Sequence, residues 1–349
     1  MSNRLAIACR DQAVHCDRLG SPFMVKLMGL LADNSATHPA LRSWENQFSG
    51  DISPAGISLP LRIAGGLQYL VVARKSTALA ACYPPNEVPD AALWDAVDTA
   101  LISNPEFWNA WLENAPQTNE VRRSVALIAA AHYLAAQTTL PFHLSELGAS
   151  AGLNLMFDQF SMQAGPNSFG DASSVHLTPD WIGTPPEARS IKVASRRGVD
   201  LNPLDSQDPE TQLRLLAYLW ADQPERATLT KAAIAIQNAS VDQGDAIEWL
   251  ESRLSAPFDG LHLIYHTIAW QYFPETAQAK GASLIESSGE SATADRPLAW
   301  LRMENDGSSP GAALTLRLWP GDLTVQLGRV DFHGRWMDWQ APQTLDWIR

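Results

Sequence analysis

A short apolar segment that runs into a glycine-rich turn constrains the fold of this chain more than any other feature. The stretch "LPFHLSELGASAGLNLMFDQF", from residue 140, reads as a buried strand, a tight turn and the start of a helix. Strand patterns recur in "SIKVASRRGVDLNPLD" and "FDGLHLIYHTIAWQYF", with helical patterns between them. Strands that alternate with helices predict an α/β fold with a mostly parallel sheet covered on both faces.

The chain is predicted to have two domains. Residues 1–115 show helical periodicity with Ser21 as one helix cap, and predict an all-helical N-terminal cap domain. Residues 116–349 carry the α/β pattern, with Thr118 as the expected cap of the first helix. A stretch at about 161–195 is rich in Gly, Pro and Ser and predicts an insertion with a short hairpin, and the alternating C-terminal residues predict three strands that add an antiparallel hairpin.

Composition excludes several classes of protein. The net charge of −13 argues against nucleic acid and anionic membrane as partners. The three cysteines form no Cys-x-x-Cys pair, so neither a disulfide framework nor a metal site is predicted. The most apolar segment, 124–136, is shorter than the roughly 20 residues that span a bilayer. We therefore expect a soluble, cytoplasmic protein.

The glycine turn admits two interpretations. Gly148, Ser150 and Gly152 match Gly-x-Ser-x-Gly, the nucleophile elbow of serine hydrolases. A hydrolase fold, however, places several strands and an oxyanion loop before the elbow, and the residues upstream here read as helical. A serine hydrolase that uses Ser150 remains the minor alternative.

The other interpretation is a loop that holds a nucleotide-like cofactor. Glu146 and the glycine turn end the first strand, where backbone amides at a helix N-terminus can approach a ligand. The second strand ends in Asp200, a suitable acceptor for ribose hydroxyls, and Asp245 follows the third strand, where the base would lie. The missing middle glycine disfavours a dinucleotide, because Ser150 occupies that position.

Taken together, these segments resemble the class I S-adenosylmethionine (SAM)-dependent methyltransferases. The matches lie in Glu146–Asn154, Gly198–Pro203 and Gly244–Ala246. More narrowly, "TNEVRRS", "ELGASAGLNL", "GVDLNP", "GDA" and "HGRWMDW" resemble an uncharacterised bacterial family known as a domain of unknown function. The resemblance implies a Rossmann-like methyltransferase fold, SAM as cofactor, and methyl transfer to a small molecule. A non-catalytic protein that binds a nucleoside ligand or a partner is the alternative from another class.

The resemblance also implies roles for individual residues. The cofactor would be held by Glu146, Gly148, Ser150, Gly152, Asn154, Asp200, Asn202, Asp245 and Ala246. The cofactor or substrate would be enclosed by Asn119, Glu120, Arg123 and Trp270. His266 lies at the carboxyl end of the fourth strand pattern, where its ordinary pKa near 6.5 suits a general base that takes a proton from the methyl acceptor. A buried histidine satisfied by the backbone is the structural alternative.

Overall fold

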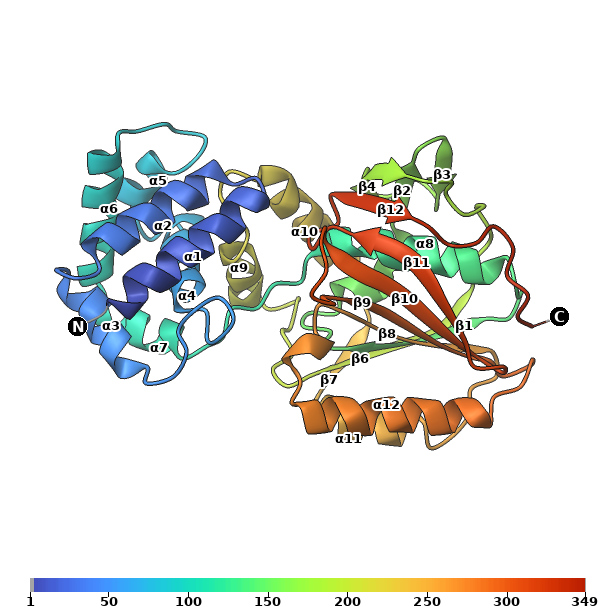
Figure 1. Ribbon diagram of the computed structural model, residues 1–349. Coiled ribbons are helices and arrows are strands. Elements are labelled where there is room, and N and C mark those ends of the chain that lie inside the picture. The colour runs from blue at the N-terminus through green and yellow to red at the C-terminus, as the bar shows by residue number, and fades with distance from the viewer. Residues whose placement is uncertain (1–2, 349) are drawn as a thin grey trace. The chain divides into compact units, whose positions relative to one another are not determined.

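The structure, a computed structural model, describes residues 3–348 and divides into two compact units (Figure 1). A helical unit contains the chain up to Thr118 together with Gln207–Thr228, and a sheet unit contains Asn119–Ser206 and the chain from Leu229 onward. The predicted division after residue 115 is therefore wrong in one respect, because Gln207–Thr228 leaves the α/β part of the sequence and joins the helical unit. The predicted domains include residues 1–2 and 349, which lie outside the described residues.

The helical unit confirms the all-helical prediction for the N-terminal region. Ser21 caps the second helix as expected, since its Oγ accepts from the backbone N–H of Met24 at 3.2 Å. The unit contains α1 (Arg4–Arg18), α2 (Pro22–Asn34), α3 (Pro39–Gln47), α4 (Leu59–Val72), α5 (Thr77–Cys82), α6 (Asp90–Ile102), α7 (Pro105–Leu112) and α9 (Pro209–Ala217).

Polar and apolar contacts both join Gln207–Thr228 to the helical unit. Asp222 accepts from the Ser21 hydroxyl at 2.6 Å and from the Phe23 N–H at 2.9 Å. Tyr218 lies in the core of the unit and packs so closely on α4 that a Cβ at Gly65 would approach its ring to 2.5 Å. Such contacts between distant parts of the chain leave no periodic signal, which explains why the sequence pattern did not assign this segment.

A large, mostly parallel sheet forms the other unit, as the sequence predicts. Its strand order is β5-β12-β11-β10-β9-β8-β1-β6-β7. The parallel part contains β7 (Ser240–Gln243), β6 (Val193–Asp200), β1 (Phe142–Leu147), β8 (Leu261–Thr267) and β9 (Leu298–Glu304). From β1 the order proceeds outward through β6 and β7 on one side and through β8 and β9 on the other, so the winding direction reverses between β1 and β8. In open α/β sheets, ligands bind beyond the carboxyl ends of the strands at such a reversal.

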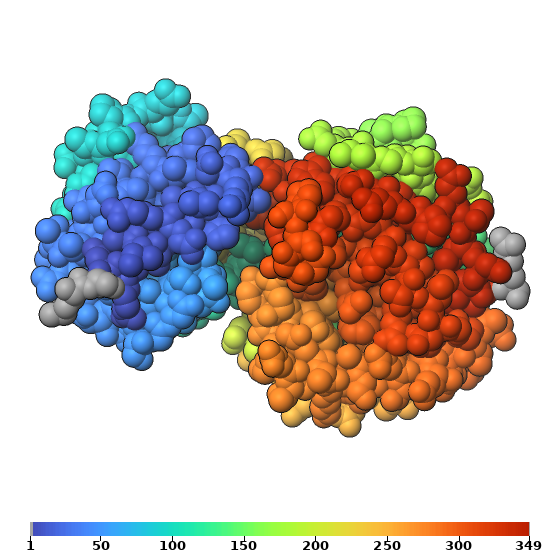
Figure 2. Space-filling view, in the orientation of Figure 1, coloured from blue at the N-terminus to red at the C-terminus, as the bar shows by residue number. Residues whose placement is uncertain are grey.

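Helices cover both faces of this sheet. On one face lie α11 (Ala246–Arg253) and α12 (Glu275–Glu290), and on the other lies α8 (Ser124–Ala135) (Figure 1). The first of these faces has its own apolar core, in which Leu147 and Ile264 from the strands meet Leu250 and Ile285 from the helices. In the space-filling view, α12 (orange) and the last strands (red) form much of the visible surface of this unit (Figure 2).

The helix predicted after β1 and the glycine turn is present as the short 3₁₀ helix η2 (Leu153–Gln159). The predicted cap of the next helix is wrong. Thr118 does not cap the next helix: Glu120 accepts from the Arg122 N–H and begins the 3₁₀ turn η1 (Val121–Arg123), which leads into α8. A three-residue turn is hard to distinguish from a helix start in sequence because both place polar residues before an apolar run.

The insertion near 161–195 contains the predicted hairpin and continues beyond it. Its strands β2 (Ser161–Ala164), β3 (Asn167–Phe169) and β4 (His176–Leu177) form a separate small sheet. The next strand, β5 (Asp180–Ile182), pairs with β12 at the far edge of the main sheet. The insertion thus loops out between β1 and β6, which remain direct neighbours.

The C-terminal residues form an antiparallel meander with one more strand than predicted. After β9 come β10 (Ala312–Trp319), β11 (Leu323–Val330) and β12 (Trp336–Trp339). The predicted last strand divides because a turn interrupts it: Asp331 accepts from the backbone N–H groups of His333 and Arg335. The remaining helical elements are α10 (Pro224–Ile236), which crosses the boundary between the two units, and η3 (Trp270–Tyr272). None of the helices within residues 3–348 has the length and apolar character needed to span a bilayer.

Candidate functional site at the carboxyl ends of the parallel strands

The glycine turn lies directly after β1, beside the point where the strand order reverses. Gly148, Ser150 and Gly152 all adopt positive φ angles, of 72°, 53° and 71°. Positive φ angles at every second residue turn the chain back sharply. The Leu204 N–H donates to the Ser150 carbonyl in this turn, and Gln237 donates to the Ala151 carbonyl. A serine held in the left-handed region is strained, and such strain gathers at functional sites.

Asp200, at the end of β6, anchors the turn from the neighbouring strand. One of its carboxylate oxygens accepts the Ser150 N–H at 2.8 Å and the other accepts the Asn202 N–H at 2.9 Å. Asp200 is partly exposed and Asn202 exposed. Asp200 thus places a carboxylate, which only accepts hydrogen bonds when ionised, at the end of β6 beside the turn.

Asp245 and Ala246 follow β7 at the same edge of the sheet. The exposed Asp245 caps α11, since its Oδ1 accepts from the N–H groups of Ile247 and Glu248 at 2.8 and 3.1 Å. Ala246 is buried as the first residue of the helix. Asp245 thus has a structural role in helix capping. Both printed bonds use Oδ1, and the described residues place no hydrogen-bond donor on Oδ2.

Glu146 is the most unusual group of the site. Its side chain is buried with 2% exposure, and its Oε2 has no hydrogen-bond partner within residues 3–348. Burial, and then the nearby Asp200 carboxylate, raise the pKa of Glu146 well above its ordinary value; a hydrogen bond from Tyr265 and the charge of Arg123 oppose this. Glu146 is therefore a buried carboxyl group with a raised pKa and one oxygen available to a ligand.

The Ser150 hydroxyl is also buried without a partner within the described chain. In particular, no imidazole is hydrogen-bonded to its Oγ, although a serine nucleophile needs an adjacent base. The left-handed backbone of Ser150 resembles a nucleophile elbow, but the base that would activate the serine is not beside it.

Hydrogen bonds from the segment before α8, and from the first residue of α8, hold the chain that follows the glycine turn. Asn119 accepts the Leu153 N–H at 2.9 Å, and Ser124 donates to Oδ1 of Asn154 at 2.8 Å. The Nδ2 of Asn154 in turn donates to the Glu120 carbonyl at 3.3 Å. Both ends of the buried Asn154 amide are bonded within the protein, so its predicted contact with a cofactor does not fit; Asn154 holds the loop instead.

Arg123 connects three elements at the carboxyl ends of the strands. Its Nη1 donates to the Thr267 carbonyl at 3.1 Å, at the end of β8, and its Nε donates to the Phe332 carbonyl at 3.0 Å. Its charge also acts on Glu146. The contacts of Arg123 and Glu120 described here are thus directed to the protein, and their role in closing the site stays a prediction.

The predicted role of His266 as a general base does not fit the structure. The ring is fully buried, with its Nδ1 2.6 Å from Glu304 Oε1. The indole N–H of Trp300 donates to its Nε2 at 3.1 Å. Because an indole nitrogen only donates, Nε2 must be the unprotonated nitrogen, and its lone pair is already in use. His266 is a structural residue, as the alternative interpretation holds.

Trp270 and the loop after β8 complete this region. Trp270 stacks on the His266 ring at 4.8 Å, partly exposed. Two residues earlier, Ile268 has a φ of 52°, which is a rare conformation for a β-branched side chain. The strained loop approaches the glycine turn so closely that a Cβ at Gly148 would lie 2.6 Å from that of Ala269.

Three residues that matter here had no motif in the sequence. Tyr265 pairs in register with Glu146 and donates its hydroxyl to the Asn154 carbonyl at 3.4 Å, Ser124 holds Asn154, and Glu304 holds His266. A signal for Tyr265 did exist, because strands that are expected to be neighbours place their polar residues at matching positions. The partners of Asn154 and His266 are 30 and 38 residues away and could not be paired without the fold.

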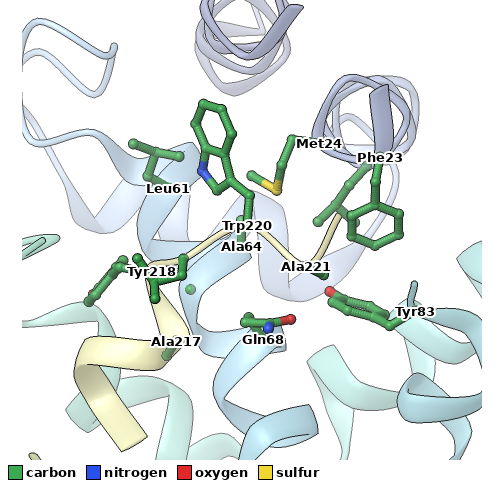
Figure 3. Close-up of a pocket in the computed structure, with 13 residues that line it drawn as sticks. Phe23, Met24, Leu61, Ala64, Gln68, Tyr83, Ala217, Tyr218, Trp220 and Ala221 are labelled. Carbon is green, nitrogen blue, oxygen red and sulfur yellow. The ribbon is translucent and has the colours of Figure 1, made fainter. Parts of the chain in front are cut away.

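A small cavity lies within the helical unit. Its volume is about 20 Å³, and its walls include Phe23, Met24, Tyr83, Tyr218 and Trp220 (Figure 3). Figure 3 shows the Gln68 amide oxygen pointing to the side on which Tyr83 lies. This volume is on the scale of one buried water, so the pocket is too small for a cofactor or substrate.

The close approach at Gly148 leads to a prediction. Gly148→Ala places a Cβ at φ 72° and 2.6 Å from the Ala269 Cβ, so we expect a loss of about 1–3 kcal/mol in the free energy of unfolding, measured with urea. Gly244→Ala is the matched control at the same edge, because a Cβ there meets nothing within 4 Å and the φ is ordinary. Equal stability of the two variants would contradict the proposed contact.

Comparison with known sequences identifies the family. The model of a family described as "Uncharacterized protein conserved in bacteria (DUF2332)" matches residues 6–339. The chain belongs to this family. The match extends over both units of the DUF2332 chain. No curated protein and no solved structure matches the chain, so function has to be inferred from the site itself.

Proposed function

We propose that this protein binds SAM at the carboxyl ends of β1, β6 and β7 and transfers its methyl group to a small molecule. The observation that carries the proposal is the buried Glu146 carboxyl with an unpartnered oxygen, beside a left-handed glycine turn that Asp200 anchors. This arrangement lies where the strand order reverses, the usual ligand position in an open α/β sheet.

The residues present fit the polar groups of SAM. Ribose hydroxyls and the adenine amine are donors, and carboxylates accept them. Asp200 lies at the end of β6, where it would accept from ribose, Asp245 retains one carboxylate oxygen for the base, and Glu146 Oε2 is free for the amino-acid end. The strand order β7-β6-β1-β8-β9 supports a Rossmann-like methyltransferase fold for this part of the chain.

The chain contributes positioning to the reaction. SAM supplies an electrophilic methyl group when bound. With His266 engaged at both nitrogens, methyl transfer rests on holding the two reactants in line rather than on this residue as a base. Arg123 and Trp270 remain candidates to close the site around a small acceptor. The net charge of −13 disfavours nucleic acid as that acceptor.

The geometry of His266 also favours a second candidate, a protein that binds a nucleoside ligand without catalysis. A titration and a transfer assay separate the two candidates. SAM and its demethylated product bind in both cases, whereas transfer of a labelled methyl group to acceptors from a bacterial extract occurs only with an enzyme. The minor hydrolase alternative predicts instead that Ser150 reacts with a fluorophosphonate.

Calorimetric titration with SAM and its demethylated product tests the site. Asp200→Ala removes a charged acceptor, so we expect the affinity to fall about 10- to 100-fold. Asp208→Asn is the matched control: it replaces an exposed aspartate that caps α9 in the helical unit, and asparagine caps equally well. Absence of binding of either molecule by the folded wild-type protein would overturn the proposal.

A further inference from the structure

A pocket in the sheet unit, outside the proposed cofactor site, combines two arginines with two aromatic rings. Its volume is about 460 Å³, and its lining includes Arg197, Asp242, Trp249, Arg253 and Phe258. α11 is capped by Asp245 at the carboxyl edge and has Arg253 as its last residue, roughly 12 Å from the cap along the helix axis. The pocket therefore lies away from the glycine turn, and the proposed function does not use it.

The two arginines have different surroundings. Arg197 forms a two-pronged ion pair with Asp242, with distances of 2.6 and 3.0 Å. Arg253 has only neutral acceptors: its Nε donates to the Ser145 hydroxyl at 3.1 Å and its Nη2 to the Leu144 carbonyl at 3.5 Å. No carboxylate pairs with Arg253 within residues 3–348. A half-buried guanidinium without a counter-ion is unusual, because desolvated charges are normally paired.

The charge balance of the lining favours an anion. Asp242 is the single carboxylate of the lining, and it already accepts from Arg197 and from the Trp249 indole. Burial, and then the charge of Arg197, lower the pKa of Arg253, which shows that the two guanidinium groups repel each other in this pocket. His262, behind Arg253, adds no charge, because burial lowers its pKa to about 3. One positive charge of the pocket is thus uncompensated.

Aromatic rings hold Arg253 in place. Its guanidinium carbon lies 4.6 Å from the Phe258 ring centre and 5.6 Å from that of Trp249. Phe258 is fixed in turn by the ring of His143, which stacks on it at 4.7 Å. A guanidinium that is oriented before the ligand arrives loses less entropy on binding.

We propose that this pocket binds a small aromatic oxyanion, an aryl phosphate or aryl carboxylate, through Arg197 and Arg253. The Nη1 groups of both arginines have no acceptor within the described chain and suit the paired oxygens of either group. The rings of Trp249 and Phe258 provide apolar surface for the aryl part. The volume of about 460 Å³ lies within the range of small-molecule sites.

Calorimetric titration of the full-length protein with phenyl phosphate, benzoate and inorganic phosphate tests this proposal. We expect phenyl phosphate or benzoate to bind at least tenfold more tightly than inorganic phosphate, and binding to weaken as NaCl is raised because the contacts are ionic. Phe258→Leu should reduce the preference for the aryl compounds. Failure of both aryl compounds to bind, or equal affinity for inorganic phosphate, would overturn the proposal.

Variants of the two arginines identify the site. Arg253→Gln and Arg197→Gln should each reduce affinity at least tenfold, whereas Arg189→Gln, which changes an exposed arginine paired with Glu187, should not. If Arg253→Gln fails to fold, because it loses its contacts with β1, the more exposed Arg197→Gln and the conservative Arg253→Lys still test the site. Unchanged affinity in Arg197→Gln would place the oxyanion elsewhere.

Discussion

Glu304→Ala should destabilise the sheet unit by about 3–5 kcal/mol, the largest effect on stability that we expect from a single polar residue here. The Glu304 carboxylate accepts from His266 Nδ1 at 2.6 Å and from the N–H groups of Ala269, Trp270 and Gln271. Alanine leaves the buried His266 ring and the half-buried N–H groups of Ala269 and Trp270 without this acceptor. Urea unfolding of the variant, followed by circular dichroism, measures the loss.

Two comparisons separate this network from a general effect of charge. Glu304→Gln keeps an amide oxygen and should lose less stability than the alanine variant. Glu251→Ala removes an exposed carboxylate that pairs with Lys280, and should change stability by less than about 1 kcal/mol. A Glu304→Ala variant as stable as Glu251→Ala would show that the network contributes nothing.

The contribution of Glu304 to the free energy of unfolding should be lost in acid. Burial tends to raise the pKa of this carboxyl, but the hydrogen bonds from His266, Ala269 and Trp270 outweigh it and hold the pKa below its ordinary value. A lowered folded-state pKa means that the stabilisation is present above the ordinary pKa of glutamate and is lost as the pH falls through the folded-state value. The difference between wild type and Glu304→Ala should therefore narrow in acid.

Glu146→Gln should raise the free energy of unfolding, whereas Glu304→Ala lowers it, and it should weaken the binding of SAM. The pKa of the buried Glu146 lies well above its ordinary value, so the folded chain binds a proton that the unfolded chain has released. Wild-type stability then falls by about 1.4 kcal/mol for each pH unit between the ordinary and the folded-state pKa. The amide does not ionise, so the variant should gain over the wild type across this range.

Unfolding by urea at several pH values from 4 to 9 measures this gain in stability, and titration with SAM measures the expected loss of affinity. The two proteins should have similar stability at the acidic end, where Glu146 is protonated in both the folded and unfolded states. A constant difference at all pH values would show that Glu146 is ionised in the folded protein. Asp259→Asn is a suitable control, because Asp259 is an exposed carboxylate distant from Glu146 in the β8 register.

The architecture could be predicted because it depends on periodic patterns. Alternation of strands and helices indicated a mostly parallel sheet, and helical spacing indicated the N-terminal helices. Glu146, Asp200 and Asp245 could be expected at one edge for the same reason, since each lies at or just after the end of a parallel strand and parallel strands end together.

The roles of the individual polar groups depend on contacts that no local pattern records. His266 follows the same logic of strand ends as Glu146, yet the fold places Trp300 and Glu304 on its two nitrogens and removes it from chemistry. The assignment of Gln207–Thr228 to the helical unit likewise depends on Asp222 meeting the Ser21 cap. Periodicity within a segment specifies which face is buried, whereas hydrogen-bond partners and pKa values arise from residues that are remote in the chain and adjacent only after folding.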